Sequence, residues 1–223
     1  MLTIYAPSSN PKSKAWEVFN GVKNSWPGQV VINDNSTATE PLSNSMFWGF
    51  VNNNLKPDNH YWRICKNKIH ASFFEDCKSD RFDKFNIKIK APTLNGKHIL
   101  VCPSSPGIHA YLGTPDWTSD TVEQLKRYTD RPIKVREKPR GRGTSGPSEA
   151  KVPLSEDLKD AWACVTSCSI SAIEAVCMGK PVYCHEKSFA SDIGNLHLAD
   201  IETPVYADPE PWLHSLAYQQ FTP

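Results

Sequence analysis

The sequence predicts an α/β protein of two small Rossmann-like lobes, each built around a parallel sheet. Short apolar runs rich in β-branched residues alternate with stretches of helical spacing, most regularly over residues 98–184. Most of these runs end in turns rich in Pro, Gly or Ser. The 223 residues, of which 39% are hydrophobic, can form one domain or two small ones. We place the boundary after residue 95, so that residues 1–95 form an N-terminal lobe and residues 96–223 a C-terminal lobe.

The N-terminal lobe is expected to open with a strand, a helix and a second strand. Residues 2–6 form an apolar run that ends at a proline-rich turn, and residues 29–32 are short and β-branched. Between them, a helix over residues 14–24 is predicted by the spacing of Trp16, Phe19 and Val22. Runs that predict strands or loop anchors follow at 46–51, 61–65 and 69–74. An extended segment within residues 75–95 is indicated by the alternation of Phe85, Ile87 and Ile89.

The C-terminal lobe shows a regular β-α-β-α-β-α-β order. We expect strands over residues 98–102, 132–136, 162–166 and 181–184. The intervening helices are expected over residues 119–128, 154–159 and 170–178, with loops at 103–107 and 138–153 and no clear closing helix before Gln219. This order predicts a parallel sheet with right-handed crossovers. Ligands of such sheets bind beyond the carboxyl ends of the strands, which here carry residues 103–107, 136–138, 166–169 and 185–187.

The composition excludes several classes of protein. No apolar run approaches the 18 residues of a membrane span, and residues 1–11 lack the basic start and long apolar segment of a signal peptide. The seven cysteines are odd in number and contain no Cys-x-x-Cys pair, which argues against a disulfide framework or a zinc ribbon. Buried thiols in a reducing compartment are expected instead at Cys102, Cys164, Cys168, Cys177 and Cys184. We therefore expect a cytoplasmic protein.

Charge is unevenly distributed along the chain despite a net charge of only +1. Residues 61–97 hold nine Lys or Arg against four Asp or Glu, and residues 131–151 hold seven against two. Residues 152–223 hold three against ten. The basic stretches predict either a cleft for a phosphorylated ligand or nucleic acid, or ordinary solvated loops with scattered lysines.

The most informative segment runs from Thr166 to Val182, where a strand leads through a turn of small hydroxyl residues into a helix. Free backbone N–H groups at such a turn favour an anion. Glu174 follows Ser171 by three residues, and a carboxylate there can accept two hydrogen bonds, as from a ribose diol. Ser169 alternatively serves only as a helix cap, and Glu174 only as part of a solvated face. Three other residues at strand ends are candidates for the same cleft, namely Ser104, Ser105 and His185.

The pattern Ser-x-x-Glu-Ala-x-x-x-Gly-Lys-Pro-Val, which begins at Ser171, resembles the C-terminal lobe of GT-B glycosyltransferases and related sugar-nucleotide epimerases. It is most similar to the capsular-polysaccharide and phage-encoded transferases, and the likeness covers about residues 98–200. The resemblance implies a minimal GT-B fold in which Glu174 binds the ribose of the donor. It also implies phosphate contacts from Ser167, Ser169 and Ser171, with Arg136 and Lys138 in the place of an Arg-x-His-Pro-like element. There Lys138 replaces the histidine, and alternatively the basic pair only marks the exit of a strand.

Together these observations predict a donor nucleotide site formed by Ser104, Ser105, Arg136, Lys138, Thr166, Ser167, Ser169, Ser171, Glu174 and His185. The expected reaction transfers a sugar from a nucleotide diphosphate sugar to a glycan or to a modified base in phage DNA, in the host cytoplasm if the chain is phage-encoded. No cofactor is expected, and the lack of an Asp-x-Asp pair argues against a metal-dependent transferase. A general base is not assigned, although candidates in the N-terminal lobe, the expected acceptor side, are Asp34, Asp58, His60 and Asp76. The alternatives are a non-catalytic nucleotide-binding module, a sugar-nucleotide 2-epimerase and a plain nucleic-acid-binding protein.

Overall fold

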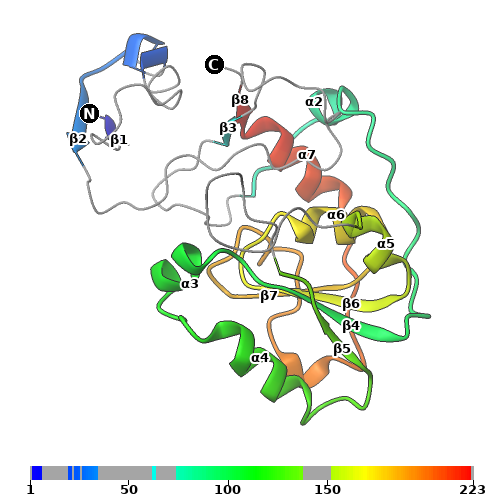
Figure 1. The fold of residues 1–223 in the computed structure, drawn as a ribbon. Coiled ribbons are helices and arrows are strands. Elements are labelled where there is room, and N and C mark those ends of the chain that lie inside the picture. The colour runs from blue at the N-terminus through cyan, green and yellow to red at the C-terminus, as the bar shows by residue number, and fades with distance from the viewer. Residues whose placement is uncertain are drawn as a thin grey trace.

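A four-stranded parallel sheet forms the core of the described C-terminal part of the chain. The computed structural model describes residues 2–6, 20–21, 23–25, 27–34, 62–63, 74–137 and 152–221. The sheet has the order β5-β4-β6-β7, and each neighbouring pair is parallel (Figure 1). Its strands are β4 (His98–Cys102), β5 (Ile133–Val135), β6 (Ala161–Thr166) and β7 (Val182–Cys184). The expected α/β class with a Rossmann-like parallel sheet is confirmed, and one such lobe is evident within the described residues.

The strand order places a topological switch point between β4 and β6. The chain passes from β4 outward to β5 on one side, and then crosses to β6 and β7 on the other side. The register aligns Cys102 with Thr166 and Thr166 with Cys184, so three strands end at nearly the same level. Loops that leave adjacent strands in opposite directions open a crevice at this point. The carboxyl edge of β4 and β6 is therefore the place where this fold can accommodate a ligand.

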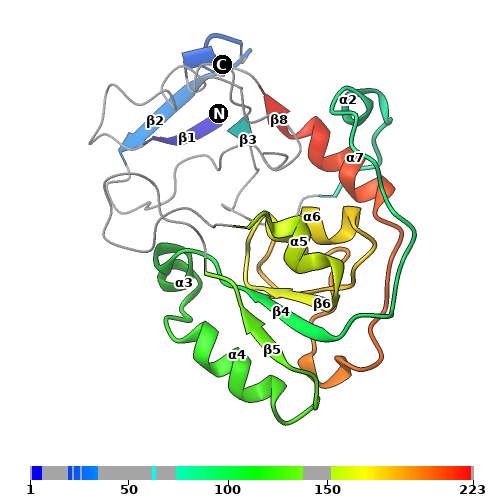
Figure 2. The ribbon, with the colours of Figure 1, turned by 45° about the vertical axis from the view of Figure 1, so that its right-hand side comes forward.

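Helices cover both faces of the sheet, as Figures 1 and 2 show. On one face, α5 (Leu154–Lys159) and α6 (Ser171–Cys177) pack on the side chains of Leu100, Cys102 and Cys164. On the other face, α4 (Trp117–Leu125) and the short 3₁₀ helix η2 (Leu198–Asp200) lie against a cluster that contains Ile99, Val101 and Val165. Successive strand residues thus alternate between two buried clusters, which is why β4 is apolar along its whole length.

Four helices of the described residues were missed in the sequence, and two of them are longer than four residues. Residues 103–107 were expected to form a loop, but α3 (Pro106–Leu112) begins there, with Pro106 at a helix start, where proline is favoured. The expectation that no helix closes the chain was wrong, because α7 (Glu210–Tyr218) does so. Its Trp212 stacks on Phe189 with ring centroids 6.0 Å apart, and α7 also packs against α2 (Asp80–Asp83). The proline that follows Glu210 obscured the start of α7 in the sequence, because proline also marks loops. It is nevertheless compatible with the first turn of a helix.

The segment before β4 packs on the C-terminal core without regular structure after α2. Phe85, Ile87 and Ile89 are partly buried against the cluster that contains α6. The backbone N–H of Thr93 donates to the carbonyl of Gly179, at 2.9 Å. Gly179 has φ = 71° and lies so close to the Ala91 carbonyl that a Cβ atom would overlap it. A glycine is therefore required where α6 turns into β7.

The N-terminal region contains the expected first and second strands. β1 (Leu2–Ala6) pairs in parallel with β2 (Val30–Asp34), and residues 20–21 and 23–25 between them are helical. This confirms the strand-helix-strand opening. β3 (Trp62–Arg63) pairs antiparallel with β8 (Gln220–Phe221). The expected strand at 46–51 and most of the expected runs at 61–65 and 69–74 lie outside the described residues, and the boundary after residue 95 stays a prediction.

The described residues also bear on the composition arguments. Their five core cysteines, Cys102, Cys164, Cys168, Cys177 and Cys184, are all buried and none of them forms a disulfide, as expected. In the part of the chain that the structure describes, no helix is long and apolar enough to cross a membrane. The same part contains no cluster of three or more His, Cys, Asp or Glu residues that could hold a metal ion.

Candidate functional site

Each predicted site residue that the structure describes lies at or after the carboxyl end of a strand of the sheet, on both sides of the switch point. Ser104 and Ser105 lie in the connection from β4 to α3, and Ser167 and Ser169 lie in the connection from β6 to α6. The two connections contact each other directly, because the backbone N–H of Cys168 donates to Ser104 Oγ at 3.1 Å. Sequence segments more than 60 residues apart are thus joined at one point.

A buried row of polar side chains holds the two connections together. Ser167 Oγ donates to Ser104 Oγ at 2.8 Å, and His109 Nε2 lies 2.9 Å from Ser167 Oγ. Ser167 is completely buried, and Ser104 and His109 are nearly so. A buried hydroxyl without any partner costs about 1–3 kcal/mol, so these hydrogen bonds stabilise the mutual position of the two loops.

His109 is a site residue that the sequence analysis missed. It lies on α3, which was expected to be a loop, and no motif marks it. Its ring packs against Trp117 with centroids 5.4 Å apart. Burial lowers the pKa of His109, and the nearby Glu137 carboxylate offsets this only in part. The imidazole is therefore neutral at pH 7, with one donor and one acceptor nitrogen.

Burial divides the hydroxyl residues of the β6–α6 turn into two groups. Thr166 and Ser171 face inward, and Thr166 Oγ1 and Ser171 Oγ are both buried without a hydrogen-bond partner among the described residues. Ser169 is half-exposed, and its Oγ accepts the backbone N–H of Ser171 at 3.3 Å. Ser105, before α3, is also half-exposed. Among these four, a ligand can reach Ser105 and Ser169 most directly.

Glu174 is a half-buried carboxylate on α6. Burial raises the pKa of Glu174, and the Arg136 guanidinium lowers it by a smaller amount. Within the described ranges no hydrogen bond reaches the Glu174 carboxylate. A carboxylate that has lost part of its hydration and has no protein donor retains its capacity to accept hydrogen bonds from a ligand.

Arg136 follows β5 and continues the sheet, with its backbone N–H donating to the Val101 carbonyl at 2.8 Å. Its guanidinium forms an ion pair with Asp157 of α5 and donates to the Val152 carbonyl at 2.7 Å. These contacts fix the position of the guanidinium, while Asp157 neutralises part of its charge. Lys138, its expected companion, lies outside the described residues.

His185 follows β7 and extends the edge on the far side of β6. Its backbone N–H donates to the Ser167 carbonyl at 3.2 Å, and its Nδ1 accepts the Lys187 N–H at 3.1 Å. Burial is the main cause of its lowered pKa. The neutral ring therefore carries its proton on Nε2, which is the nitrogen left to donate to a ligand.

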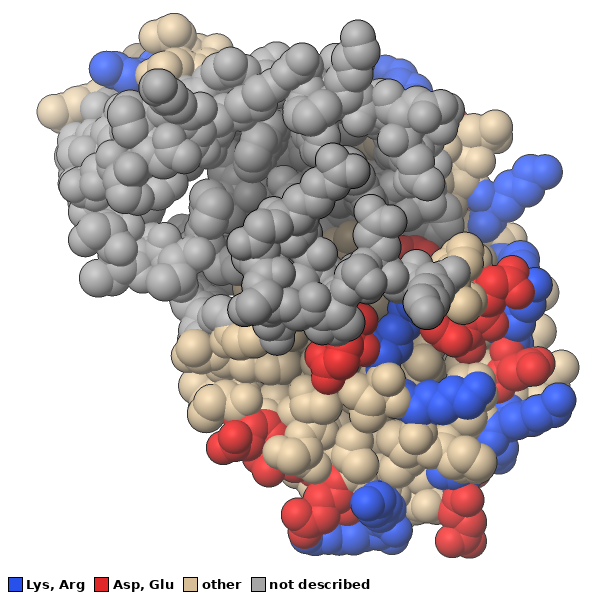
Figure 3. All heavy atoms as spheres, in the orientation of Figure 1, with Lys and Arg blue, Asp and Glu red and all other residues tan. Residues whose placement is uncertain are grey.

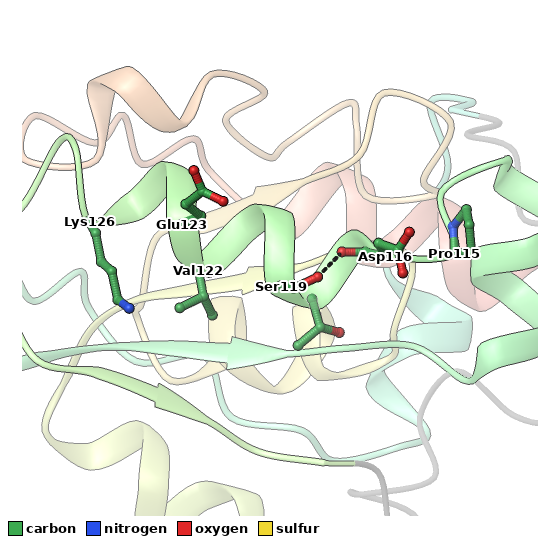
Figure 4. Close-up of a pocket in the computed structure, with 7 residues that line it drawn as sticks. Pro115, Asp116, Ser119, Val122, Glu123 and Lys126 are labelled. Carbon is green, nitrogen blue, oxygen red and sulfur yellow. Dashed lines mark hydrogen bonds between the residues drawn. The ribbon is translucent and has the colours of Figure 1, made fainter.

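The open hollow in Figure 4 is a separate surface. It has a volume of about 600 Å³ and lies along α4, where Ser119 Oγ donates to the Asp116 carbonyl at 2.8 Å. None of the predicted site residues lines it.

Charges of both signs are interspersed on the described part of the face in Figure 3. The described residues on that face therefore form no continuous basic surface.

Comparisons with known proteins give no match. Neither a protein-family model, nor a curated protein, nor a solved structure is similar to this chain. Arguments about function therefore depend on the geometry at the carboxyl edge of β4 and β6.

Proposed function

We propose that this protein is a glycosyltransferase that binds a nucleotide diphosphate sugar at the carboxyl edge of its sheet. One observation carries the proposal: the hydroxyl-rich loops after β4 and β6 meet at the switch point, and the half-buried carboxylate of Glu174 follows on α6, where the Arg136 guanidinium lowers its pKa. Parallel α/β sheets bind nucleotides at this position. A carboxylate and small hydroxyl residues there match the ribose and the diphosphate of such a ligand.

In this proposal the site residues have distinct roles. Glu174 accepts hydrogen bonds from two ribose hydroxyls, while Ser104, Ser105 and Ser169 donate to phosphate oxygens. Thr166, Ser167 and Ser171 are buried and shape the turn rather than contact the ligand. Arg136 and Lys138 supply positive charge, and His185 Nε2 supplies a further donor.

The chemical contribution of this edge is electrostatic. Transfer of the sugar leaves negative charge on the departing diphosphate, and fixed donors near the developing charge lower the barrier. Arg136 is held by Asp157 and by the Val152 carbonyl, so little reorganisation is needed when the charge forms. The acceptor hydroxyl and its general base belong to a second lobe, which we assign to residues 1–95 as in the two-lobed GT-B arrangement.

A non-catalytic nucleotide-binding module is the second candidate. It is favoured by the single Rossmann-like sheet in the described residues, because one such lobe can bind a nucleotide while transfer also needs an acceptor side. The two candidates predict the same binding and differ in turnover.

Binding and turnover measurements test both candidates. Calorimetric titration with ADP, CDP, GDP and UDP should show binding of at least one nucleotide, weakened in the variant Glu174→Ala. The corresponding sugar nucleotides should then be consumed, by hydrolysis or by transfer. Binding without consumption supports the module, and no binding of any of the four refutes the donor site.

The acceptor is tested separately with DNA. Transfer to a base in phage DNA requires contact with the phosphate backbone, so the protein should bind DNA at low salt and release it as salt rises. Lack of binding at low salt would exclude the DNA acceptor and leave glycans as the acceptor class.

A further inference from the structure

One proton in the buried row of His109, Ser167 and Ser104 has no acceptor within the described part of the chain. Ser104 Oγ accepts two hydrogen bonds, from Ser167 Oγ at 2.8 Å and from the Cys168 backbone N–H at 3.1 Å. These two bonds use the lone pairs of the oxygen. The Ser104 hydroxyl proton is then left over, on a residue that is 8% exposed at the edge where the ligand would bind.

Distances between these atoms do not locate the hydroxyl protons, and either direction leaves one proton over, on Ser104 Oγ or, if His109 Nε2 accepts, on His109 Nδ1. In the direction that ends at the carboxyl edge of β4 and β6, Ser167 gives its single hydroxyl proton to Ser104. Its contact with His109 at 2.9 Å must therefore be one in which Ser167 accepts, so His109 Nε2 carries the donated proton. All donors in this direction point the same way, from the imidazole through both hydroxyls toward the carboxyl edge of β4 and β6.

The surroundings of His109 favour this arrangement. The ring is buried and held against Trp117, so its orientation is restricted. Its neutral state, caused by burial, leaves Nε2–H as a definite donor in one tautomer. In a buried row each hydrogen bond polarises the next, which makes the terminal hydroxyl a better donor than an isolated serine.

We propose that His109 is a positioning residue: it orders the hydrogen bonds of Ser167 and Ser104 so that the Ser104 hydroxyl is set to donate to a phosphate oxygen of the bound nucleotide. This inference rests on the proposed donor site. An anionic oxygen is the matching acceptor, because the row ends in a donor and its last oxygen has no lone pair left.

Two isosteric substitutions separate the hydrogen bond of His109 from its packing. His109→Phe keeps a ring against Trp117 but removes the donor, and His109→Gln places an amide N–H close to the position of Nε2. The test uses the nucleoside diphosphate that binds best among ADP, CDP, GDP and UDP. We expect His109→Phe to weaken its binding by about fivefold, the effect of roughly one neutral hydrogen bond. His109→Gln should bind within about twofold of the wild type. His214→Phe on α7, whose ring contacts Phe82, is the matched control and should have no effect.

A double-mutant cycle distinguishes positioning from a merely structural role. Because His109 acts through Ser104, the variant His109→Phe/Ser104→Ala should bind no worse than Ser104→Ala alone. Independent losses that multiply would overturn the proposal, as would a folded His109→Phe variant that binds like the wild type. A circular-dichroism melt establishes that each variant is folded.

The tautomer of His109 provides a readout that needs no ligand. A long-range ¹H–¹⁵N spectrum of the full chain, with the signal assigned from its loss in His109→Gln, should show the proton on Nε2. A proton on Nδ1 would reverse the row and refute the inference even if nucleotides bind. Conversely, a proton on Nε2 in a protein that binds no nucleotide would preserve the ordered row and refute the proposed function.

Discussion

Replacement of Glu174 by Gln should weaken nucleotide binding while leaving the fold as stable as before or more so. The substitution keeps the size of the side chain and removes its charge. The wild-type carboxylate is half-buried, has a raised pKa because of that burial, and lacks a hydrogen-bond donor within the described residues. Its charge therefore costs folding free energy, which glutamine does not. The two effects have opposite signs, so general damage to the fold cannot imitate them.

The size of the binding effect follows from the number of hydrogen bonds. A hydrogen bond to a charged group contributes about 1.5–3 kcal/mol, against about 0.5–1.5 kcal/mol for a neutral pair. If Glu174 accepts two ribose hydroxyls, Glu174→Gln loses about 1 kcal/mol at each. The expected total of about 2 kcal/mol corresponds to an affinity about 30-fold weaker, which calorimetric titration measures readily.

The pH dependence supplies a second measure of the same residue. The raised pKa means that folded Glu174 takes up a proton above its ordinary value of 4.5, where the unfolded chain does not. Its contribution to the free energy of unfolding therefore declines as pH rises from 4.5 through the raised pKa. Over the same interval nucleotide affinity should increase, because the accepting carboxylate forms. Both changes should be missing in Glu174→Gln.

Glu123→Gln is the matched control, since Glu123 is an exposed carboxylate on α4 that pairs with Arg127 at 2.6 Å. It should change neither nucleotide affinity nor its pH dependence. The reasoning is refuted if Glu174→Gln binds nucleotide as tightly as the wild type, or if its melting temperature falls together with its nucleotide affinity. In either case the carboxylate supports the fold and not the ligand.

Three further predictions concern the fold and the turn. Gly179→Ala should lower the free energy of unfolding by about 2 kcal/mol or more in urea titrations, because φ is 71° and the new methyl overlaps the Ala91 carbonyl; Gly113→Ala, with φ of 75° and open space, is the control and should cost less. Stability should also decline as pH falls below about 6.5, because the unfolded chain takes up protons that the folded chain resists at His98, His109 and His185; a melting temperature that rose over this range would contradict the argument. Finally, Ser169→Ala should weaken nucleotide binding, whereas Ser171→Ala should leave both binding and melting temperature nearly unchanged, since the Ser171 hydroxyl faces the protein interior; the reverse pattern in parallel titrations would count against the proposed division of the turn.

The C-terminal sheet could be predicted from sequence because each of its strands is a short apolar run ended by a turn. The expected strand at 98–102 matches β4, and the helix at 154–159 matches α5. Local signals were weaker where a proline begins a helix. α3 and α7 both begin this way, and the same residue type that favours a first turn also marks a loop.

The candidate site was only partly predictable. Strand ends identify which residues share an edge, and they predict that Ser104 and Ser167 lie together, as the hydrogen bond between them shows. The direction in which each hydroxyl points depends on tertiary packing, so Ser169 and Ser171 look alike in the sequence and differ in burial. His109 is one helical turn from Ser105, but its partner Ser167 is 58 residues away, and no local pattern carries such a contact.

The burial of some hydroxyl groups and the exposure of others also restrict the chemistry that is possible at the carboxyl edge of the sheet. Ser167 is completely buried, so it cannot attack a substrate as a serine nucleophile despite its contact with His109. The Ser–His pair is therefore better understood as part of the framework that fixes the two loops. What such a framework can present to a ligand is a set of fixed donors and one accepting carboxylate, Glu174. That combination suits a molecule with an anionic part and a diol, and it accounts for why we place the nucleotide, rather than the acceptor, at this edge.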